Sequence, residues 1–258
     1  MTDSRIPALQ RMNDVLGYIA RSGPALPADI IKALSLPRSS IYLLVEEMKA
    51  MNFITQDPDG RCRLWMRLIE LGEAASEGID IRQVARRHLA RLTEETGLLS
   101  HLGIIRGNSA YYVLKIESSA TISVRSREGK TISLCRSGVG KCLLAWQPWA
   151  AREALVAGMA YRQATPNSIA TPERLREEIR QIRERGWAVD DEEDVPNVRC
   201  VAAPVFDARN LIVAAISAVG ATVQITPEAI PALSVQVCGC AQAISRELGW
   251  SAPLAGAS

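Results

Sequence analysis

Long apolar runs are missing from this sequence of 258 residues. No stretch reaches the ~18 consecutive apolar residues that identify a membrane-spanning helix. The first residues also lack the basic segment and the following apolar segment that together make a signal peptide. These absences predict a cytoplasmic protein that does not associate with a membrane.

Patterns that bind metals or form disulfides are missing as well. Only two histidines occur, His88 and His101, and the six cysteines include no C-x-x-C pair. Zinc sites need nitrogen and sulfur ligands clustered at set spacings, and disulfides are rare in the reducing cytosol. We therefore expect no metal, no cofactor and no disulfide, with the cysteines serving mostly as small core residues.

The chain has no strong excess of one charge. Its formal net charge is +2, and residues 1–69 contain nine Arg and Lys residues against seven Asp and Glu residues. Because neutralisation of phosphates supplies much of the affinity for nucleic acid, a strong DNA-binding protein usually carries a larger positive surplus. An argument for DNA binding therefore has to rest on the geometry of a motif.

Residues 1–65 carry the pattern of a winged helix-turn-helix domain. Helical spacing of apolar residues, interrupted by Ser, Gly and Pro, predicts helices over about 7–21, 27–34 and 38–51. Short strands at 53–56 and 61–64 follow, joined by the turn Asp57-Pro-Asp-Gly60. Three helices followed by a hairpin is the order of elements in a winged helix.

The third helix is the candidate recognition helix. Its apolar residues Ile41, Leu44, Val45 and Met48 fall at i, i+3, i+4 and i+7, which predicts a buried stripe. In a helix-turn-helix, the first residues of this helix contact base edges in the major groove, while hydroxyls and basic groups contact phosphates. The residues expected to contact DNA are Arg38, Ser39, Ser40, Tyr42 and Leu43, with Arg61 and Arg63 of the hairpin on the backbone. The alternative is a helical hairpin that only packs in a core.

The remainder of the chain predicts a linker helix at 66–79, a second domain at 80–250 and a tail at 251–258. Helices are expected at about 80–96, 139–146, 148–158, 171–185 and 226–248. Strands are expected at 99–106, 110–117, 121–127, 131–135, 187–190, 198–206 and 211–219. Because the strands outnumber the helices between them, a mainly antiparallel sheet flanked by helices is expected, and the fold class is α+β.

Two segments of the second domain are candidate binding sites for a small molecule. The loop Gly138-Val-Gly-Lys141 fails as a P-loop, because Cys135 and Cys142 stand where Gly and Ser or Thr are needed. Its amides favour a carboxylate, or its glycines only allow a helix to pack closely on the sheet. The acidic run Asp190-Asp-Glu-Glu193 is a solvated turn, or one carboxylate points inward to accept hydrogen bonds from a ligand hydroxyl.

Catalysis is not expected. Cys200 as a nucleophile would need a neighbouring base. His88 lies in a basic, solvated stretch, and His101, at the start of a predicted strand, is expected to be structural. No G-x-S-x-G elbow occurs.

Several segments in order resemble the IclR family of transcriptional regulators over roughly residues 8–249. They are Leu36-Pro-Arg-Ser-Ser-Ile-Tyr42, Asp57-Pro-Asp-Gly-Arg-Cys-Arg-Leu64, Glu70-Leu-Gly72, Ser137-Gly-Val-Gly-Lys141, Asp190-Asp-Glu-Glu193, Val198-Arg-Cys-Val-Ala-Ala-Pro-Val-Phe-Asp207 and Ala215-Ile-Ser217. The resemblance implies a GAF/PAS-like second domain, binding to a double-stranded DNA operator, and a homodimer formed through the DNA-binding half and linker or a homotetramer.

The resemblance also implies a pocket for a small organic acid, derived from a sugar or aromatic, that controls a catabolic operon as repressor or activator. The residues it implies there are Leu134, Gly138, Val139, Asp190, Val198, Cys200, Ser217 and Val219. Two positions depart from the family: Leu43 replaces a common Arg and can contact a thymine methyl, and Val219 replaces a common Ser. Two other classes stay open, namely a ligand-binding module whose winged helix is a protein-protein adaptor, and a small-molecule enzyme.

Overall fold

The computed structural model describes residues 6–35, 37–118 and 126–251. The chain divides into two compact units, Met1–Ile79 and Asp80–Ser258, each with its own core. Among the described residues, no helix combines the length and the apolar character needed to cross a membrane.

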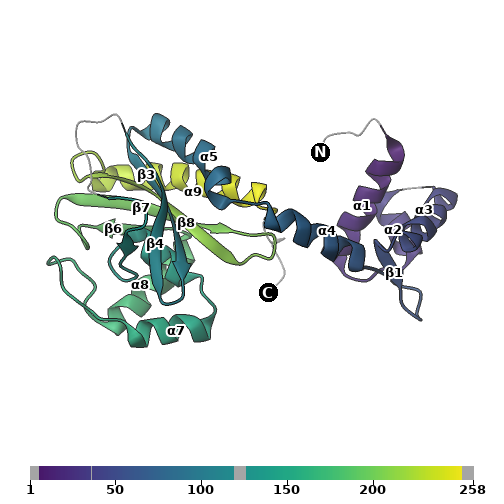
Figure 1. The fold of residues 1–258 in the computed structure, drawn as a ribbon, viewed down its shortest axis with the longest axis horizontal. Helices are drawn as coiled ribbons and strands as arrows, with labels where there is room; N and C mark the ends of the chain where they lie inside the picture. The colour runs from purple at the N-terminus through teal and green to yellow at the C-terminus, as the bar shows by residue number, and fades with distance from the viewer. Residues whose placement is uncertain (1–5, 36, 119–125, 252–258) are drawn as a thin grey trace. The chain divides into compact units, whose positions relative to one another are not determined.

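The first unit is a three-helix fold followed by a hairpin, as the sequence predicts (Figure 1). It contains α1 (Pro7–Ser22), α2 (Pro27–Leu34), α3 (Arg38–Ala50), the antiparallel strands β1 (Ile54–Gln56) and β2 (Cys62–Leu64), and α4 (Met66–Glu77). Pro7 and Pro27 occupy the first positions of their helices, where the missing N–H costs nothing. Gly60 has a φ of 82°, which lets the chain turn between the two strands of the hairpin.

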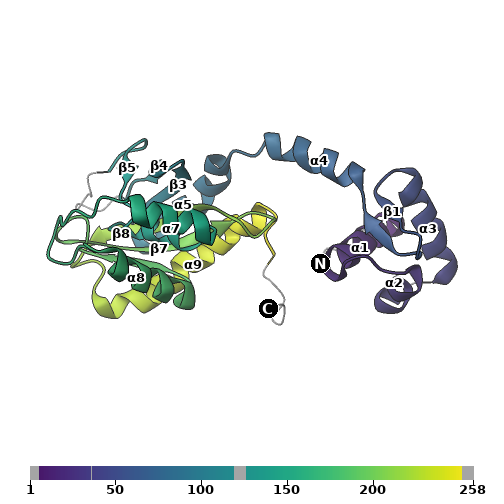
Figure 2. The ribbon, with the colours of Figure 1, turned by 90° about the horizontal axis from the view of Figure 1, so that it is seen from below.

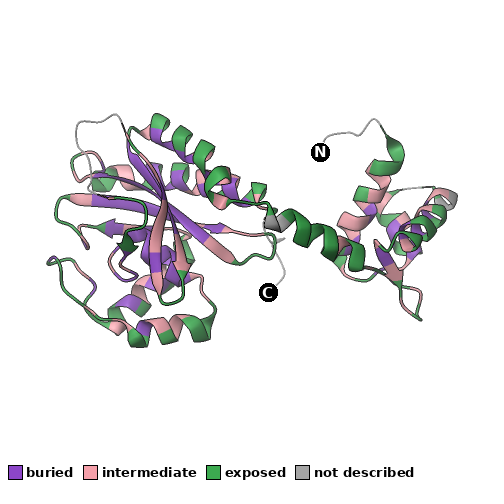
Figure 3. Ribbon diagram, viewed as in Figure 1, coloured by how far each residue is buried: buried purple, intermediate pink, exposed green. Residues whose placement is uncertain are grey.

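α4 is exposed along its described length except at Leu68, which is half-buried (Figure 3). Met66, Ile69 and Leu71 are each about half exposed, and Trp65 just before the helix is 41% exposed. An apolar helix surface of this kind is not covered by the chain's own core, in contrast with α1 and α3, which bury one stripe each.

The second unit is built on one six-stranded sheet in the order β5-β4-β3-β8-β7-β6. Its strands are β3 (Leu99–Arg106), β4 (Ser109–Ile116), β5 (Thr131–Ile132), β6 (Ala188–Asp191), β7 (Val198–Phe206) and β8 (Ile212–Ala221). Every neighbouring pair in this sheet is antiparallel. The expected α+β class with an antiparallel sheet is confirmed.

Helices cover both faces of this sheet (Figures 1 and 2). α5 (Ile81–Thr96) and α9 (Ile230–Glu247) pack on one face, and α6 (Gly138–Ala145), α7 (Trp149–Gly158) and α8 (Pro172–Arg185) form the layer on the other. Because successive strand residues point to opposite faces, Leu102 packs under α5 while His101 points to the face that carries α6. The candidate site lies on this second face.

Two elements differ by more than two residues from the sequence prediction. The strand expected at 131–135 ends at Ile132, because the chain turns to place Ser137 as the N-cap of α6. The last helix begins with a 3-10 turn at Pro227–Ala229 before α9. Most of the strand expected at 121–127 lies outside the described residues, and residues 126–127 are not in a strand; the expected tail, apart from Ser251, also lies outside them.

Candidate functional site

The third helix of the first unit has one buried and one exposed face. Ile41 and Val45 are buried in the core, whereas Tyr42 is 51% and Leu43 is 65% exposed. Ser40 is half-buried, and the side chains of Arg38 and Ser39 lie outside the described ones. The structure thus presents Tyr42 and Leu43 to solvent near the start of α3, where a helix-turn-helix contacts base edges.

The two arginines of the hairpin are paired with acidic residues of its own turn. Arg63 lies 2.6 Å from Asp57, and Arg61 lies 3.2 Å from Asp59. Exposed ion pairs contribute about 0–1 kcal/mol each, so a phosphate can replace the carboxylate at little cost. The pairs nevertheless cancel much of the positive charge of the hairpin, in line with the small charge surplus of this unit.

A cavity of about 50 Å³ lies on the α6 side of the second unit's sheet. Its lining is mixed in polarity and comes from strands β3 to β8 and the segments beside them. The lining residues are His101, Tyr112, Ser126, Lys130, Thr131, Ile132, Ser137, Asp190, Asp194, Val195, Val198, Cys200 and Val219. This volume has room for a few water molecules only, so a larger ligand requires the lining side chains to move.

Four of the eight residues expected to bind an effector line this cavity, namely Asp190, Val198, Cys200 and Val219. Cys200 and Val219 face each other in register across β7 and β8. The other four, Leu134, Gly138, Val139 and Ser217, are buried but are not part of its wall. Ser217 lies two residues from Val219, on the same face of β8.

Close packing accounts for both glycines of the loop before α6. A Cβ atom on Gly138 would lie 2.7 Å from the Cys200 sulfur, and one on Gly140 would lie 2.1 Å from the Ser133 carbonyl oxygen. The Gly140 amide already donates a hydrogen bond to the Ser137 hydroxyl. Of the two explanations for these glycines, the structure supports the close approach of helix and neighbouring chain.

Asp190 is the inward carboxylate of the acidic run. Its side chain is buried, and Oδ1 accepts a hydrogen bond of 2.8 Å from the Glu193 amide. Burial raises the pKa of Asp190 to about 7, since that hydrogen bond offsets only part of the loss of solvation. Near neutral pH this group can therefore accept a hydrogen bond or, when protonated, donate one.

His101 belongs to the cavity wall, although the sequence indicated only a structural role for it. Its side chain is 1% exposed, Nε2 lies 2.7 Å from the Ser126 hydroxyl, and the ring stacks on Tyr112 at 4.1 Å. Burial, reinforced by the nearby charges of Lys115 and Lys130, lowers the pKa of His101 to about 3, so the imidazole is neutral. Strand alternation is the only sequence signal for its position, and it needs the strand register.

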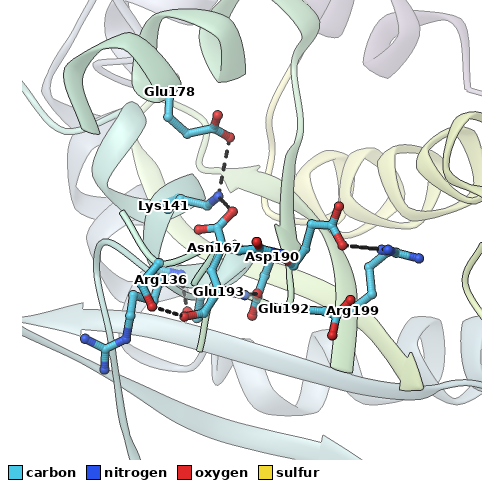
Figure 4. Close-up of polar contacts among 12 residues, drawn as sticks. Arg136, Lys141, Asn167, Glu178, Asp190, Glu192, Glu193 and Arg199 are labelled. Atoms are coloured by element: carbon cyan, nitrogen blue, oxygen red, sulfur yellow. Dashed lines mark hydrogen bonds and ion pairs between the residues drawn. The ribbon is translucent and has the colours of Figure 1, made fainter. Parts of the chain in front are cut away.

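A buried lysine lies behind the cavity, and the sequence did not reveal it. Lys141 of α6 is fully buried, and its Nζ lies 2.5 Å from Glu193 and 3.4 Å from Glu178 (Figure 4). Glu178 is also paired with Arg185 at 2.9 Å. Burial raises the pKa of Glu193 in spite of the neighbouring ammonium group.

Polar contacts hold the segment that follows β6 over the cavity. Asp191 pairs with Arg199 at 2.6 Å, and Asp194 pairs with Arg136 at 3.0 Å. The amide of Asn167 donates a hydrogen bond of 3.0 Å to the Asp191 carbonyl (Figure 4). The position of Asp190 and its neighbours is thus set by Arg136 before α6, Asn167 after α7 and Arg199 on β7.

The Cys200 thiol is not a reactive centre of the kind a nucleophilic enzyme needs. Burial raises the pKa of Cys200 well above its ordinary range, so the side chain stays protonated. All six cysteines are free, and the described residues contain no group of three or more His, Cys, Asp or Glu side chains able to hold a metal ion.

A winged helix-turn-helix at the start of the chain is typical of DNA-binding transcriptional regulators. A family model for the IclR helix-turn-helix domain matches residues 8–58, and one for the bacterial transcriptional regulator IclR C-terminal region matches residues 73–246. The chain therefore belongs to the IclR family of bacterial transcriptional regulators and carries its helix-turn-helix DNA-binding domain.

Individual relatives agree with this assignment. The chain is 50% identical over 253 residues to RhmR of Escherichia coli K12, an uncharacterized HTH-type transcriptional regulator, covering 98% of this chain and 97% of RhmR. It is 35% identical over 249 residues to the regulator XynR of the same organism, covering 96% and 99%. The crystal structure of Thermotoga maritima IclR matches with a TM-score of 0.64 at 29% identity, covering 95% and 99%. These relatives are named as regulators, which confirms the expectation that the chain is not an enzyme.

Proposed function

We propose that this regulator controls a catabolic operon from the cytoplasm, by binding an operator in double-stranded DNA in a manner that depends on a small organic acid. The observation that carries the proposal is the buried, mixed-polarity cavity of the second unit, on a chain that also has an exposed recognition helix. The ligand acts by binding more tightly to one of two states, DNA-competent or DNA-incompetent.

The DNA contacts are assigned to α3 and the hairpin. Tyr42 and Leu43 are the exposed side chains that reach base edges, with Arg38, Ser39 and Ser40 at the helix start. Arg61 and Arg63 exchange their carboxylate partners for phosphates. The position of Leu43 fits a preference for a thymine methyl.

An organic acid fits the charges around the cavity. Lys130 is the single cation among the lining residues, and it makes no ion pair with any described residue. Asp190 supplies a hydrogen-bonding partner for a ligand hydroxyl. An IclR homologue from Microbacterium hydrocarbonoxydans has been crystallised with 4-hydroxybenzoate; it shares this fold, with a TM-score of 0.60 at 23% identity.

A homodimer, alone or paired into a homotetramer, is the proposed assembly. A helix-turn-helix usually reads two half-sites about one turn of DNA apart, which requires two copies. The exposed apolar residues Trp65, Met66, Ile69 and Leu71 on and beside α4 are a surface that a second copy can cover. Light scattering distinguishes the two assemblies by mass.

The test is fluorescence anisotropy with the intergenic DNA beside the protein's own gene, at two salt concentrations. We expect sequence-dependent binding that weakens as salt rises. The double substitution Tyr42→Ala/Leu43→Ala should weaken operator binding about tenfold or more and leave binding to random DNA nearly unchanged, because base contacts specify sequence. The matched control is Met51→Ala, an equally exposed apolar residue just beyond the end of α3.

Two results would contradict this assignment. Equal affinity for operator and random DNA would favour the adaptor role of the winged helix. Sequence-dependent binding that the double substitution leaves unchanged would move the base contacts away from the exposed face of α3.

A further inference from the structure

Two buried polar atoms beside the cavity lack hydrogen-bond partners. They are Nδ1 of His101 on β3 and the hydroxyl oxygen of Ser217 on β8. The two residues are register partners on adjacent antiparallel strands, so their side chains lie next to each other on the same face of the sheet. His101 lines the cavity directly, and Ser217 lies beside it toward the core.

Unpaired polar atoms of this kind are unusual in a folded protein, because a buried donor or acceptor without a partner destabilises the fold. The rest of His101 is well satisfied by Ser126 and by the stack on Tyr112, so the ring is held in place with one nitrogen unused. The unpaired nitrogen itself is buried behind the wall, so it is suited to bind a ligand group that enters as the lining side chains move.

The chemistry of the pair selects the ligand group. A neutral imidazole offers Nδ1 either as donor or as acceptor, according to the tautomer that the Ser126 contact favours. The Ser217 hydroxyl likewise donates or accepts. A hydroxyl is the ligand group that matches both atoms in either arrangement, whereas an alkyl chain or an aromatic carbon matches neither.

The charged side chains that line the cavity differ in whether they form ion pairs. Lys130, at the rim, is available to a carboxylate, because no described residue forms an ion pair with it. Asp194 is held by Arg136, which leaves Asp190 as the lining carboxylate that forms no ion pair with a described residue. The lining therefore provides one cation, Lys130, at its edge and the hydrogen-bonding groups of His101 and Asp190, with the Ser217 hydroxyl just behind the wall.

We infer that the effector of this site is an aliphatic hydroxy carboxylic acid, with its carboxylate on Lys130 and a chain hydroxyl on His101 and Ser217. His101 is then a specificity-determining residue that rejects the deoxy acid. The inference rests on the proposed function, since it narrows the organic acid to one chemical class.

The experiment compares acids that differ only in hydroxyl content. The full-length protein is titrated in a calorimeter with threonate, ribonate and gluconate, with the straight-chain alkanoates of four to six carbons, and with benzoate. Thermal unfolding with each acid gives a second readout. The variants are His101→Phe, which keeps a ring against Tyr112, Ser217→Ala, and the matched control His88→Phe on α5, outside the cavity.

We expect at least one aldonate to bind tenfold or more tightly than the alkanoate of equal length. His101→Phe should weaken that aldonate by roughly 10- to 100-fold and leave the alkanoate nearly unchanged, because a site built to bind a hydroxyl rejects the analogue that lacks it. Ser217→Ala should produce a smaller loss, and His88→Phe none. Should His101→Phe fail to fold, Ser217→Ala decides.

Three outcomes overturn the inference. If benzoate or an alkanoate binds as tightly as every aldonate, the ligand class is wrong while the proposed effector site stands. If an aldonate is preferred but both cavity variants retain the preference, His101 and Ser217 are not the determinants. If no acid of any class binds, the proposed effector function fails together with the inference.

Discussion

Replacement of Lys141 by methionine tests how the buried charge cluster behind the cavity holds the second unit together. The ammonium group lies 2.5 Å from Glu193, and a pair at that distance attracts by roughly 7 kcal/mol at an effective dielectric constant of about 20. The Lys141→Met variant loses this attraction and leaves a carboxylate buried without its cation. Glu178 keeps its partner Arg185.

The loss of stability in the Lys141→Met variant is limited because Glu193 can take up a proton, which costs less free energy than burying the unpaired carboxylate. Protonating a carboxyl group costs about 1.4 kcal/mol for each pH unit above its ordinary pKa, which is 4.5 for Glu193. At pH 7 the protonation of Glu193 costs at most about 3.4 kcal/mol, well below the attraction of roughly 7 kcal/mol. The cost of protonation therefore determines how much stability the variant loses. We therefore expect Lys141→Met to reduce the free energy of unfolding by about 3 kcal/mol at pH 7, within the range measured for broken buried pairs.

The stability that Lys141→Met removes should be smaller at low pH than at neutral pH. In the variant the pKa of Glu193 is higher in the folded state than in the unfolded state, so stability is greatest below the unfolded pKa and is lost as pH rises. Urea unfolding at pH 5, 6 and 7, followed by circular dichroism, should show a penalty that shrinks toward pH 5. The control Lys141→Met/Glu193→Gln should recover most of the loss at pH 7. A penalty that is equal at all three pH values would refute this reasoning.

Two further substitutions test the neighbouring geometry. Asp190→Asn should flatten the pH dependence of stability. Because the pKa of Asp190 is raised in the folded state, the wild type should lose roughly 1 kcal/mol of stability per pH unit relative to the variant up to about pH 7, and no further stability above that pH. Parallel stability curves for the two proteins would show that Asp190 titrates normally. Gly140→Ala should cost about 3 kcal/mol in urea unfolding, since its Cβ would lie 2.1 Å from the Ser133 carbonyl oxygen. Gly239→Ala in α9, with nothing within 4 Å, is the control and should stabilise slightly; similar effects for both glycines would contradict the packing argument.

The elements of the first unit were predictable because their signals are local. Pro7 and Pro27 begin helices, and the turn at Asp57–Gly60 joins two strands a few residues apart. The helical spacing of Ile41, Val45 and Met48 also placed the buried face of α3 correctly. Each of these features depends on residues close in sequence, so a single sequence contains them.

Much of the candidate site depends on distant residues and was not predictable. Lys141 can be buried because its ammonium group pairs with Glu193 and Glu178, which lie 52 and 37 residues away in the chain. The sequence around Lys141 does not show these partners, and a lysine without partners is almost always exposed. His101 reaches the cavity through its pairing with Ser217, and the register shift between Leu102 and Gly103 in β3 is invisible in composition. Asp190 and Cys200 were placed through the family resemblance rather than through periodicity.

The pairing of β3 with β8 also fixes the order in which the protein can be assembled during synthesis. Its partners Leu99–Val219 and Gly103–Ala215 are separated by 120 and 112 residues in the chain. The hairpin of the first unit, in contrast, is complete by Leu64. Contacts between distant residues form slowly, and a nascent chain emerges from its N-terminus. The nascent chain therefore completes its winged-helix unit well before Val219, the last lining residue of the cavity, has been synthesised, so the cavity can close only after most of the second unit exists.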